Sequence, residues 1–159
     1  MLYPKHYGEN PLFPQQGDFE IVSIDDDVGK GVITYRGFKK GELVAVMAGE
    51  IIQELRQHSL QIDDTNHLYD IYFSGYFLHS CRPNVSLDMK NLRVTAIRNI
   101  KPNSYLYMDY AETEEQLFKQ FACGCGSRQC RGWITGYNQV PDELEPNYID
   151  FISHQSIAV

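Results

Sequence analysis

Short runs in which apolar and polar residues alternate occupy much of the chain. Three such runs, at residues 20–24, 31–35 and 43–47, are separated by acidic or glycine-containing turns and are typical of strands. Two more strands are predicted at residues 92–97 and 105–108. The pattern therefore predicts a mainly β fold of small antiparallel sheets with minor helices.

Two segments near the end of the sequence have helical patterns. Thr113-Glu-Glu-Gln has the form of a capping box, and apolar residues follow it at helical spacing, which predicts a short helix there. Pro141 and Pro146 interrupt the chain further on. Apolar residues at 148–152 predict a last amphipathic turn that docks on the body.

Length and composition fit one globular domain. The chain has 159 residues, of which 43% are apolar and 22% are charged. Its longest apolar stretch, residues 43–48, is far too short to span a bilayer. The first residues lack the basic region and apolar run of a secretory signal. We therefore expect an intracellular protein without membrane contact, cytoplasmic or, in a eukaryote, nuclear.

The net charge of −7 is distributed unevenly. The segment after Asn138 has four acidic residues, Asp142, Glu143, Glu145 and Asp150, and no Lys or Arg. Such a chain is a poor candidate for binding phosphates and a better one for attracting a basic peptide. We expect a protein or peptide partner rich in Lys or Arg, and no direct contact with nucleic acid.

All four cysteines fall into two short motifs. Three lie in Cys123-Gly-Cys125-Gly-Ser-Arg-Gln-Cys130, and Cys81 lies in His79-Ser-Cys-Arg-Pro-Asn. Disulfides and free thiols are the alternatives, but an intracellular chain disfavours disulfides, and Cys123 and Cys125 are too close for an easy bridge. The spacing favours one structural zinc ion held by all four sulfurs. A closed site of this kind has no open position for chemistry.

Four motifs in order resemble the SET-domain protein-lysine methyltransferases. They are Gly29-Lys-Gly31-Val with Lys40-Gly-Glu, His79-Ser-Cys-Arg-Pro-Asn84, the segment ending in Met108-Asp-Tyr110, and Cys123 to Trp133, which is similar to a post-SET zinc module. The resemblance implies a SET fold in which residues 79–84 and 109–110 form a pseudoknot, with a zinc-bound C-terminal flap.

The resemblance also implies a division of the chain. The expected parts are an N-terminal extension (1–19), a SET domain (20–112), a post-SET helix and zinc module (113–137) and an acidic C-terminal segment (138–159).

The activity implied by the resemblance is methyl transfer from S-adenosylmethionine to the side-chain amine of lysine, releasing S-adenosylhomocysteine. The substrate would be a basic protein, such as a histone-like, ribosomal or translation protein. Tyr110 would be the catalytic residue, because its phenol oxygen can orient the amine and stabilise the polarised methyl group. No dedicated general base is evident. The alternative is a catalytically weak or inactive SET-fold module that binds basic partners.

The resemblance assigns further residues to the donor site and the lysine channel. The residues expected to bind the cofactor are Lys30, Gly31, Val32, Tyr76, Phe77, Leu78, His79 and Trp133. The residues expected to line the channel are Met47, Tyr69 and Met108. Packing on the core as a residue of the flap is the alternative role of Trp133. Leu78 stands where the family has an asparagine that hydrogen-bonds the donor, which favours the inactive alternative.

Overall fold

Small β-sheets are the main secondary structure of the molecule, as the alternating pattern predicted. The computed structural model describes residues 1–157, and the side chains of residues 1–155. The strands in chain order are β1 (Phe19–Asp25), β2 (Gly29–Thr34), β3 (Leu43–Val46), β4 (Glu50–Ile52), β5 (Ser59–Gln61), β6 (His67–Tyr69), β7 (Leu78–His79), β8 (Val85–Asp88), β9 (Arg93–Ala96), β10 (Ser104–Tyr105), β11 (Tyr107–Met108), β12 (Phe121–Ala122) and β13 (Trp133–Ile134). The helices are η1 (Lys5–Tyr7), η2 (Ser74–Tyr76), α1 (Tyr110–Thr113) and α2 (Pro146–Ile157).

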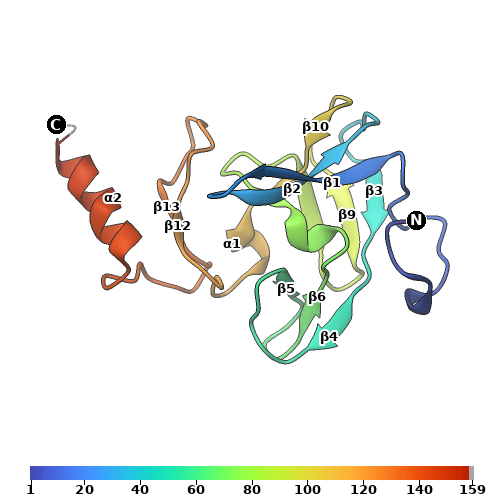
Figure 1. Cartoon of the computed structure of the whole chain (residues 1–159), viewed down its shortest axis with the longest axis horizontal. Coiled ribbons are helices and arrows are strands. Elements are labelled where there is room, and N and C mark those ends of the chain that lie inside the picture. Colours follow the sequence, from blue (N-terminus) through green and yellow to red (C-terminus); the bar gives the residue numbers. More distant parts are fainter. Residues whose placement is uncertain (158–159) are drawn as a thin grey trace.

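The strands form three sheets of three strands and two pairs. The larger sheets have the orders β1-β2-β10, β3-β9-β8 and β4-β6-β5, and each is antiparallel. The β12–β13 pair is antiparallel, whereas β7 and β11 pair in parallel. Figure 1 shows the β12–β13 pair and α2 extending from one end of the body that the larger sheets form.

The main core lies among the three larger sheets. Its fully buried apolar side chains are Val32, Leu68, Phe73, Val85, Val94, Leu106 and Met108. A second, smaller cluster contains Cys81, Leu117 and Ile134, and Tyr110 packs against both clusters. Burial of apolar area therefore fixes α1 at the junction between the sheets and the C-terminal part of the chain.

The two motifs that the resemblance places in a pseudoknot are joined by the parallel pair. Tyr107 of β11 lies opposite Leu78 of β7, and Met108 lies opposite His79. The side chain of Asn84 accepts a hydrogen bond from the Tyr107 amide at 2.8 Å. These bonds hold the segment before Tyr110 against the segment that contains Cys81, as expected for a SET fold.

The helix predicted to begin at Thr113 is wrong. The observed helix α1 ends at that residue, and Asp109 caps its first turn. The following segment is drawn to β5 instead: the Gln61 amide donates to the Glu114 carboxylate, and the Glu115 amide donates to the Gln61 side chain, both at 2.8 Å. These tertiary hydrogen bonds replace those that a longer helix would make.

The C-terminal segment forms the predicted helical turn at residues 148–152, but it docks on the flap (β12 and β13) and not on the body as predicted. It forms α2, which begins at Pro146, a favourable first position for proline because no intrahelical partner for its nitrogen is needed there. The rings of Tyr148 and Phe151 lie 5.1 and 5.7 Å from the ring of Trp133. Within residues 1–157, no helix has both the length and the apolar character needed to cross a bilayer.

Candidate active site

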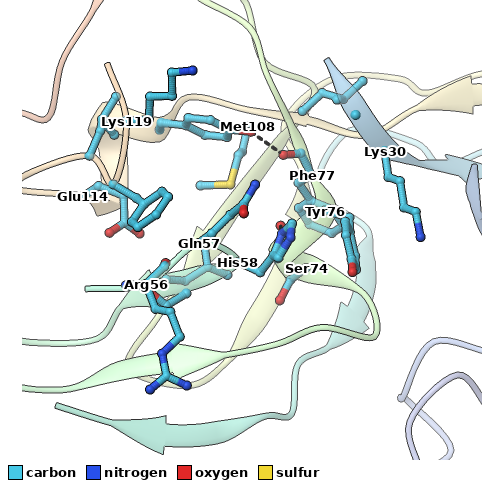
Figure 2. Close-up of a pocket in the computed structure, with 18 of the residues that line it drawn as sticks. Lys30, Arg56, Gln57, His58, Ser74, Tyr76, Phe77, Met108, Glu114 and Lys119 are labelled. Atoms are coloured by element: carbon cyan, nitrogen blue, oxygen red, sulfur yellow. Dashed lines mark hydrogen bonds between the residues drawn. The ribbon is translucent and has the colours of Figure 1, made fainter. Parts of the chain in front are cut away.

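A pocket of about 520 Å³ lies between three parts of the chain (Figure 2). They are the pseudoknot that contains β7 and β11, called the knot below, the turn that leads into β2 at residues 28–30, and the segment after α1. This volume is in the range of small-molecule sites, about 300–1,000 Å³. The residues that line it are Val28, Gly29, Lys30, Leu55, Arg56, Gln57, His58, Ser59, Leu60, Ser74, Gly75, Tyr76, Phe77, Leu78, Met108, Tyr110, Glu114, Leu117, Phe118, Lys119 and Phe121. The walls are apolar and aromatic, with a few charged groups.

Lys30 and Glu114 lie at opposite ends of the pocket in Figure 2, with Met108 and Phe77 between them. The Lys30 ammonium lies 5.9 Å from the centre of the Tyr76 ring, so this end joins a cation to an aromatic face. The preceding Gly29 has a φ of +81°, which glycine adopts without strain and which turns the chain into β2. The resemblance predicts that the methyl donor binds at the Gly29-Lys30-Gly31 motif, and this motif lies at the end of the pocket with Lys30.

Gly31 and Val32, which the resemblance places at the donor, are not among the residues that line the pocket. Val32 is a core residue with no exposed surface. A Cβ at Gly31 would lie 3.0 Å from Cδ1 of both Ile24 and Leu78. A larger residue there would require the side chains of Leu78 and Ile24 to move, so glycine allows their close packing. The pocket is lined by the backbone one step earlier, at residues 28–30.

Tyr110 lies in the pocket, and its hydroxyl group donates a hydrogen bond of 2.7 Å to the Phe77 carbonyl (Figure 2). Burial, followed by the charge of Glu114, raises the pKa of Tyr110. The phenol therefore keeps its proton at neutral pH. Its hydrogen is used by Phe77, and its oxygen can accept a contact from a polarised methyl group, but it is not a base.

His79 does not line the pocket, although it fixes Tyr110. Its side chain is 2% exposed, and burial lowers its pKa to about 4, so the ring is neutral. Because Nδ1 accepts the Tyr110 amide hydrogen at 3.1 Å, the ring proton belongs on Nε2. Nε2 lies 3.5 Å from Sγ of Cys81. His79 thus connects the backbone of Tyr110 to the cysteine cluster.

The three residues predicted to line the lysine channel lie in different places. Met108 lines the pocket and is 1% exposed. Met47 is buried in the main core and does not reach it. Tyr69 lies in β6, where its ring faces the Arg56 guanidinium at 5.2 Å, and it also does not line the pocket. Only Met108 keeps a position consistent with the predicted channel.

Trp133 is buried outside the pocket and packs against α2. Its indole nitrogen donates to Oε1 of Gln120 at 2.9 Å, and α2 covers its ring. The side chain is 8% exposed. Its expected contact with the cofactor was assigned from motif order.

The four cysteines come together as the spacing predicted. They are free thiols, and their sulfur atoms all lie within 4.8 Å of one another. Sγ of Cys81 and Sγ of Cys123 are 3.9 Å apart. Metal–sulfur bonds of ~2.3 Å in a tetrahedral site require sulfurs about 3.8 Å apart, so this set fits one metal ion. The Arg131 amide also donates to Sγ of Cys81 at 3.3 Å.

One wall of the pocket comes from residues 55–60, which the sequence analysis left unassigned. Nδ1 of His58 lies 2.9 Å from the Gly75 carbonyl, and its ring lies 4.3 Å from that of Tyr76. A Cβ at Gly75 would lie 2.0 Å from the Asp70 carbonyl, so only glycine allows this approach. No periodic signal marks this loop, because its position depends on contacts with η2.

Glu114 is another residue of the pocket that no sequence pattern indicated. Its side chain is 5% exposed although it lines the pocket. The capping-box pattern places it on the surface of a helix, whereas the hydrogen bond from Gln61 turns it inward. An acidic residue beside the capping threonine gave no signal of burial.

The order of the motifs around this pocket is shared with a known family. The sequence model of the SET domain matches residues 29–111, more than half of the 159 residues. The chain belongs to the SET-domain family. The SET match contains the Lys30 turn, both strands of the knot and Tyr110, and ends before the four-cysteine cluster is complete.

Two curated relatives of this SET domain are named methyltransferases. Methyltransferase flvH of Aspergillus flavus is 36% identical over 92 residues, which cover 53% of this chain and 52% of that protein. The H3 lysine-9-specific histone-lysine N-methyltransferase of Schizosaccharomyces pombe is 25% identical over 154 residues, covering 68% of this chain and 31% of that protein. The chain thus spans about half, or less, of the length of these relatives.

A solved structure shares the fold of this SET domain. The crystal structure of KRYPTONITE in complex with mCHG DNA and SAH superposes with a TM-score of 0.59 at 23% identity. The match covers 72% of this chain and 28% of that one.

Proposed function

We propose that this SET domain transfers a methyl group from S-adenosylmethionine to the side-chain amine of a lysine in a basic protein. The observation that carries the proposal is the position of Tyr110. Its hydroxyl group is fixed by the Phe77 carbonyl inside a pocket that has the glycine turn at one end. Family membership and the methyltransferase relatives support the same reaction.

The donor fits the end of the pocket near Lys30. The backbone at residues 28–30, the Lys30 ammonium and the ring of Tyr76 would hold it. When bound, it supplies a methyl group activated by the positive charge on sulfur. Lys30 would pair with a carboxylate of the ligand, and Tyr76 would contact its apolar parts.

Tyr110 would act on the methyl group and the amine through its oxygen. Since Phe77 takes the phenol hydrogen, the oxygen lone pairs are free to face a carbon that gains positive charge during transfer. Met108, which lines the same pocket, supplies an apolar wall that excludes water.

We infer that the four cysteines hold one structural zinc ion. A set of four thiolates at tetrahedral separations favours zinc, and it leaves no open position for a substrate. The ion would attach the segment that contains Cys123 to Cys81, next to the knot. It would therefore maintain the order of the pocket without taking part in the reaction.

The substrate class proposed is a basic segment such as a histone tail. The acidic residues after Asn138 would attract Lys and Arg along its length. The H3 lysine-9-specific relative acts on a protein of this kind according to its name. Glu114 is the only acidic side chain among the described residues that line the pocket, so one lysine, and not a whole basic stretch, would enter.

A second candidate function rests on Leu78. Its side chain packs on Gly31 in place of the asparagine amide expected to hydrogen-bond the donor. Loss of that bond would weaken donor binding and would leave a module that binds basic partners without catalysis.

Donor binding separates the two candidates. Calorimetry of the zinc-loaded chain with S-adenosylmethionine should show saturable binding, and a labelled methyl group should then appear on lysine in a mixture of histones. Tyr110→Phe should keep donor binding and lower methyl transfer by about 10²-fold, whereas the exposed Tyr35→Phe should leave it unchanged. Absence of donor binding would favour the binding module.

A further inference from the structure

Glu114 combines two features that are rarely found together in a side chain: it is 5% exposed, and one of its carboxylate oxygens has no hydrogen-bond partner. Oε1 accepts hydrogen bonds from the Gln61 amide at 2.8 Å and from the Thr113 hydroxyl at 3.2 Å. Oε2 is buried without a partner. A buried oxygen of this kind is costly unless a ligand satisfies it.

The Glu114 side chain belongs to the lining of the pocket, at the end away from the proposed donor. Glu114 lines the same pocket as Tyr110 and Met108, and Figure 2 shows it at the end away from Lys30. The other charged groups of the lining are basic: Lys30, Arg56, Lys119 and, when protonated, His58. A cation that enters the pocket therefore finds one oppositely charged group, and it is Glu114.

The lysine substrate has to lose a proton before it can react. Free lysine has a pKa near 10.4, so about one amine in 10³ is neutral at pH 7. Tyr110 cannot accept the proton, because burial and the charge of Glu114 keep it protonated. Among the described residues that line the pocket, the other proton acceptors are the ring of His58, whose Nδ1 faces the Gly75 carbonyl, and the Glu114 carboxylate with its unused oxygen. Only the carboxylate also offers a negative charge to the ammonium group.

We propose that Glu114 receives the ammonium group of the incoming lysine and takes its proton. The proposal rests on the proposed methyltransferase function. The lysine R-NH₃⁺ and the carboxylate become R-NH₂ and a carboxylic acid. The amine lone pair then forms the N–C bond as the C–S bond breaks, and the electron pair of the C–S bond stays on sulfur. The product ammonium keeps its two remaining protons, and Glu114 returns its proton to water.

The surroundings of Glu114 suit a proton acceptor near neutral pH. Burial raises its pKa to about 7 in spite of the hydrogen bonds donated by Gln61 and Thr113. Of the titratable groups on neighbouring elements, Tyr110 stays protonated, and His67, paired with Gln61 across β5 and β6, stays neutral because burial lowers its pKa. Two cationic side chains, Arg56 and Lys119, line the same pocket and are exposed, and Figure 2 shows Lys119 on the same side as Glu114.

The test compares the zinc-loaded full chain with Glu114→Gln, whose amide oxygen can still accept from Gln61 and Thr113. At pH 7, the variant should transfer methyl groups to a lysine peptide about 10²-fold more slowly. The difference in rate between the variant and the unmodified chain should shrink as pH rises toward the pKa of lysine, because more of the amine is then neutral without a proton acceptor. Glu112→Gln, an exposed change two residues away, should follow the unmodified chain.

Two outcomes would overturn the proposal. One is an unchanged rate for Glu114→Gln at pH 7. The other is an equal deficit at pH 7 and pH 9.5, which would mean that the side chain only supports the fold.

A readout without catalysis separates this proposal from the methyltransferase function. Carbon NMR of the labelled Glu114 carboxyl group should give a titration near pH 7, and its signal should shift when n-butylamine is added. A titration below pH 5, or no response to the amine, would contradict the role of Glu114. Failure of the chain to bind S-adenosylmethionine would instead contradict the proposed function and would leave the NMR result unaffected.

Discussion

The backbone amide of Tyr110 donates a hydrogen bond of 3.1 Å to Nδ1 of His79. The two residues come from different halves of the knot, and Nε2 of the same ring faces Sγ of Cys81 at 3.5 Å. One buried imidazole therefore sets the position of the tyrosine in the pocket and contacts the proposed zinc site.

Replacing His79 by Phe should keep an aromatic ring at this position but remove both polar contacts. The amide of Tyr110 would lose its partner at a largely buried site, which costs about 1–3 kcal/mol. Urea denaturation should show a free energy of unfolding reduced by this amount. His6→Phe, at an exposed ring, is the control and should change it little. Equal stability of both variants would mean that the hydrogen bond does not hold the knot.

Glu114 should make the stability of the chain depend on pH. Its pKa is about 7 in the folded chain, against an ordinary value of 4.5, so the folded state binds more protons between these values. The free energy of unfolding should therefore fall between about pH 4.5 and pH 7, by roughly 3 kcal/mol in all for a shift of this size, and level off at higher pH.

Glu114→Gln isolates this effect, because the variant has no charge to desolvate. Its stability relative to the unmodified chain should increase by roughly 3 kcal/mol between pH 4.5 and pH 8, as measured by urea denaturation. Glu112→Gln should show no comparable change, since that side chain is exposed. A pH-independent difference for Glu114→Gln would contradict the raised pKa.

Removal of the metal should loosen the flap, which contains β12 and β13, while the larger sheets stay ordered. Chelation, or Cys130→Ser, should increase hydrogen exchange in β12 and β13, while exchange in β1 and β2 stays slow. Burial raises the pKa of Cys123, so metal binding must displace protons. The apparent affinity for zinc should thus fall about tenfold or more for each unit that pH is lowered from 8 to 6. Uniform exchange across both regions would rule out a local role.

Trp133 should report on the docking of α2 and not on the donor. Phe151→Ala would expose the indole and should shift its fluorescence to longer wavelength, whereas Ile149→Ala, at an exposed position, should not. Trp133→Phe should leave the affinity for S-adenosylmethionine unchanged within about twofold, because the ring lies outside the pocket. A large loss of donor affinity would restore the role that the motif order had suggested.

Alternation of apolar and polar residues was sufficient to predict the longer strands. The runs at residues 20–24 and 43–47 correspond to β1 and β3 within one residue at each end. The β4-β6-β5 sheet was not predicted, because its strands have three residues each and are too short to produce a pattern. A single strand was expected at 105–108, where the structure has β10 and β11 in different sheets.

The site was predictable where it depends on local motifs. The four cysteines converge as their motifs indicated, and Gly29, Lys30 and Tyr110 line one pocket. The positions of Glu114 and Trp133 could not be predicted because their surroundings come from elements distant in sequence, β5 for one and α2 for the other. A tertiary hydrogen bond sets the position of Glu114, and aromatic packing sets the position of Trp133. Residues adjacent in sequence indicate neither interaction.

Leu106 connects two sheets by itself. Its amide donates to the Val32 carbonyl of β2 at 2.9 Å, and its carbonyl accepts from the Leu78 amide of β7 at 3.2 Å. Any insertion or deletion between β10 and β11 would shift the register against both neighbours together. Among homologues, chain length should therefore be invariant at this residue, while the exposed turn at residues 63–65 is free to gain or lose residues during evolution.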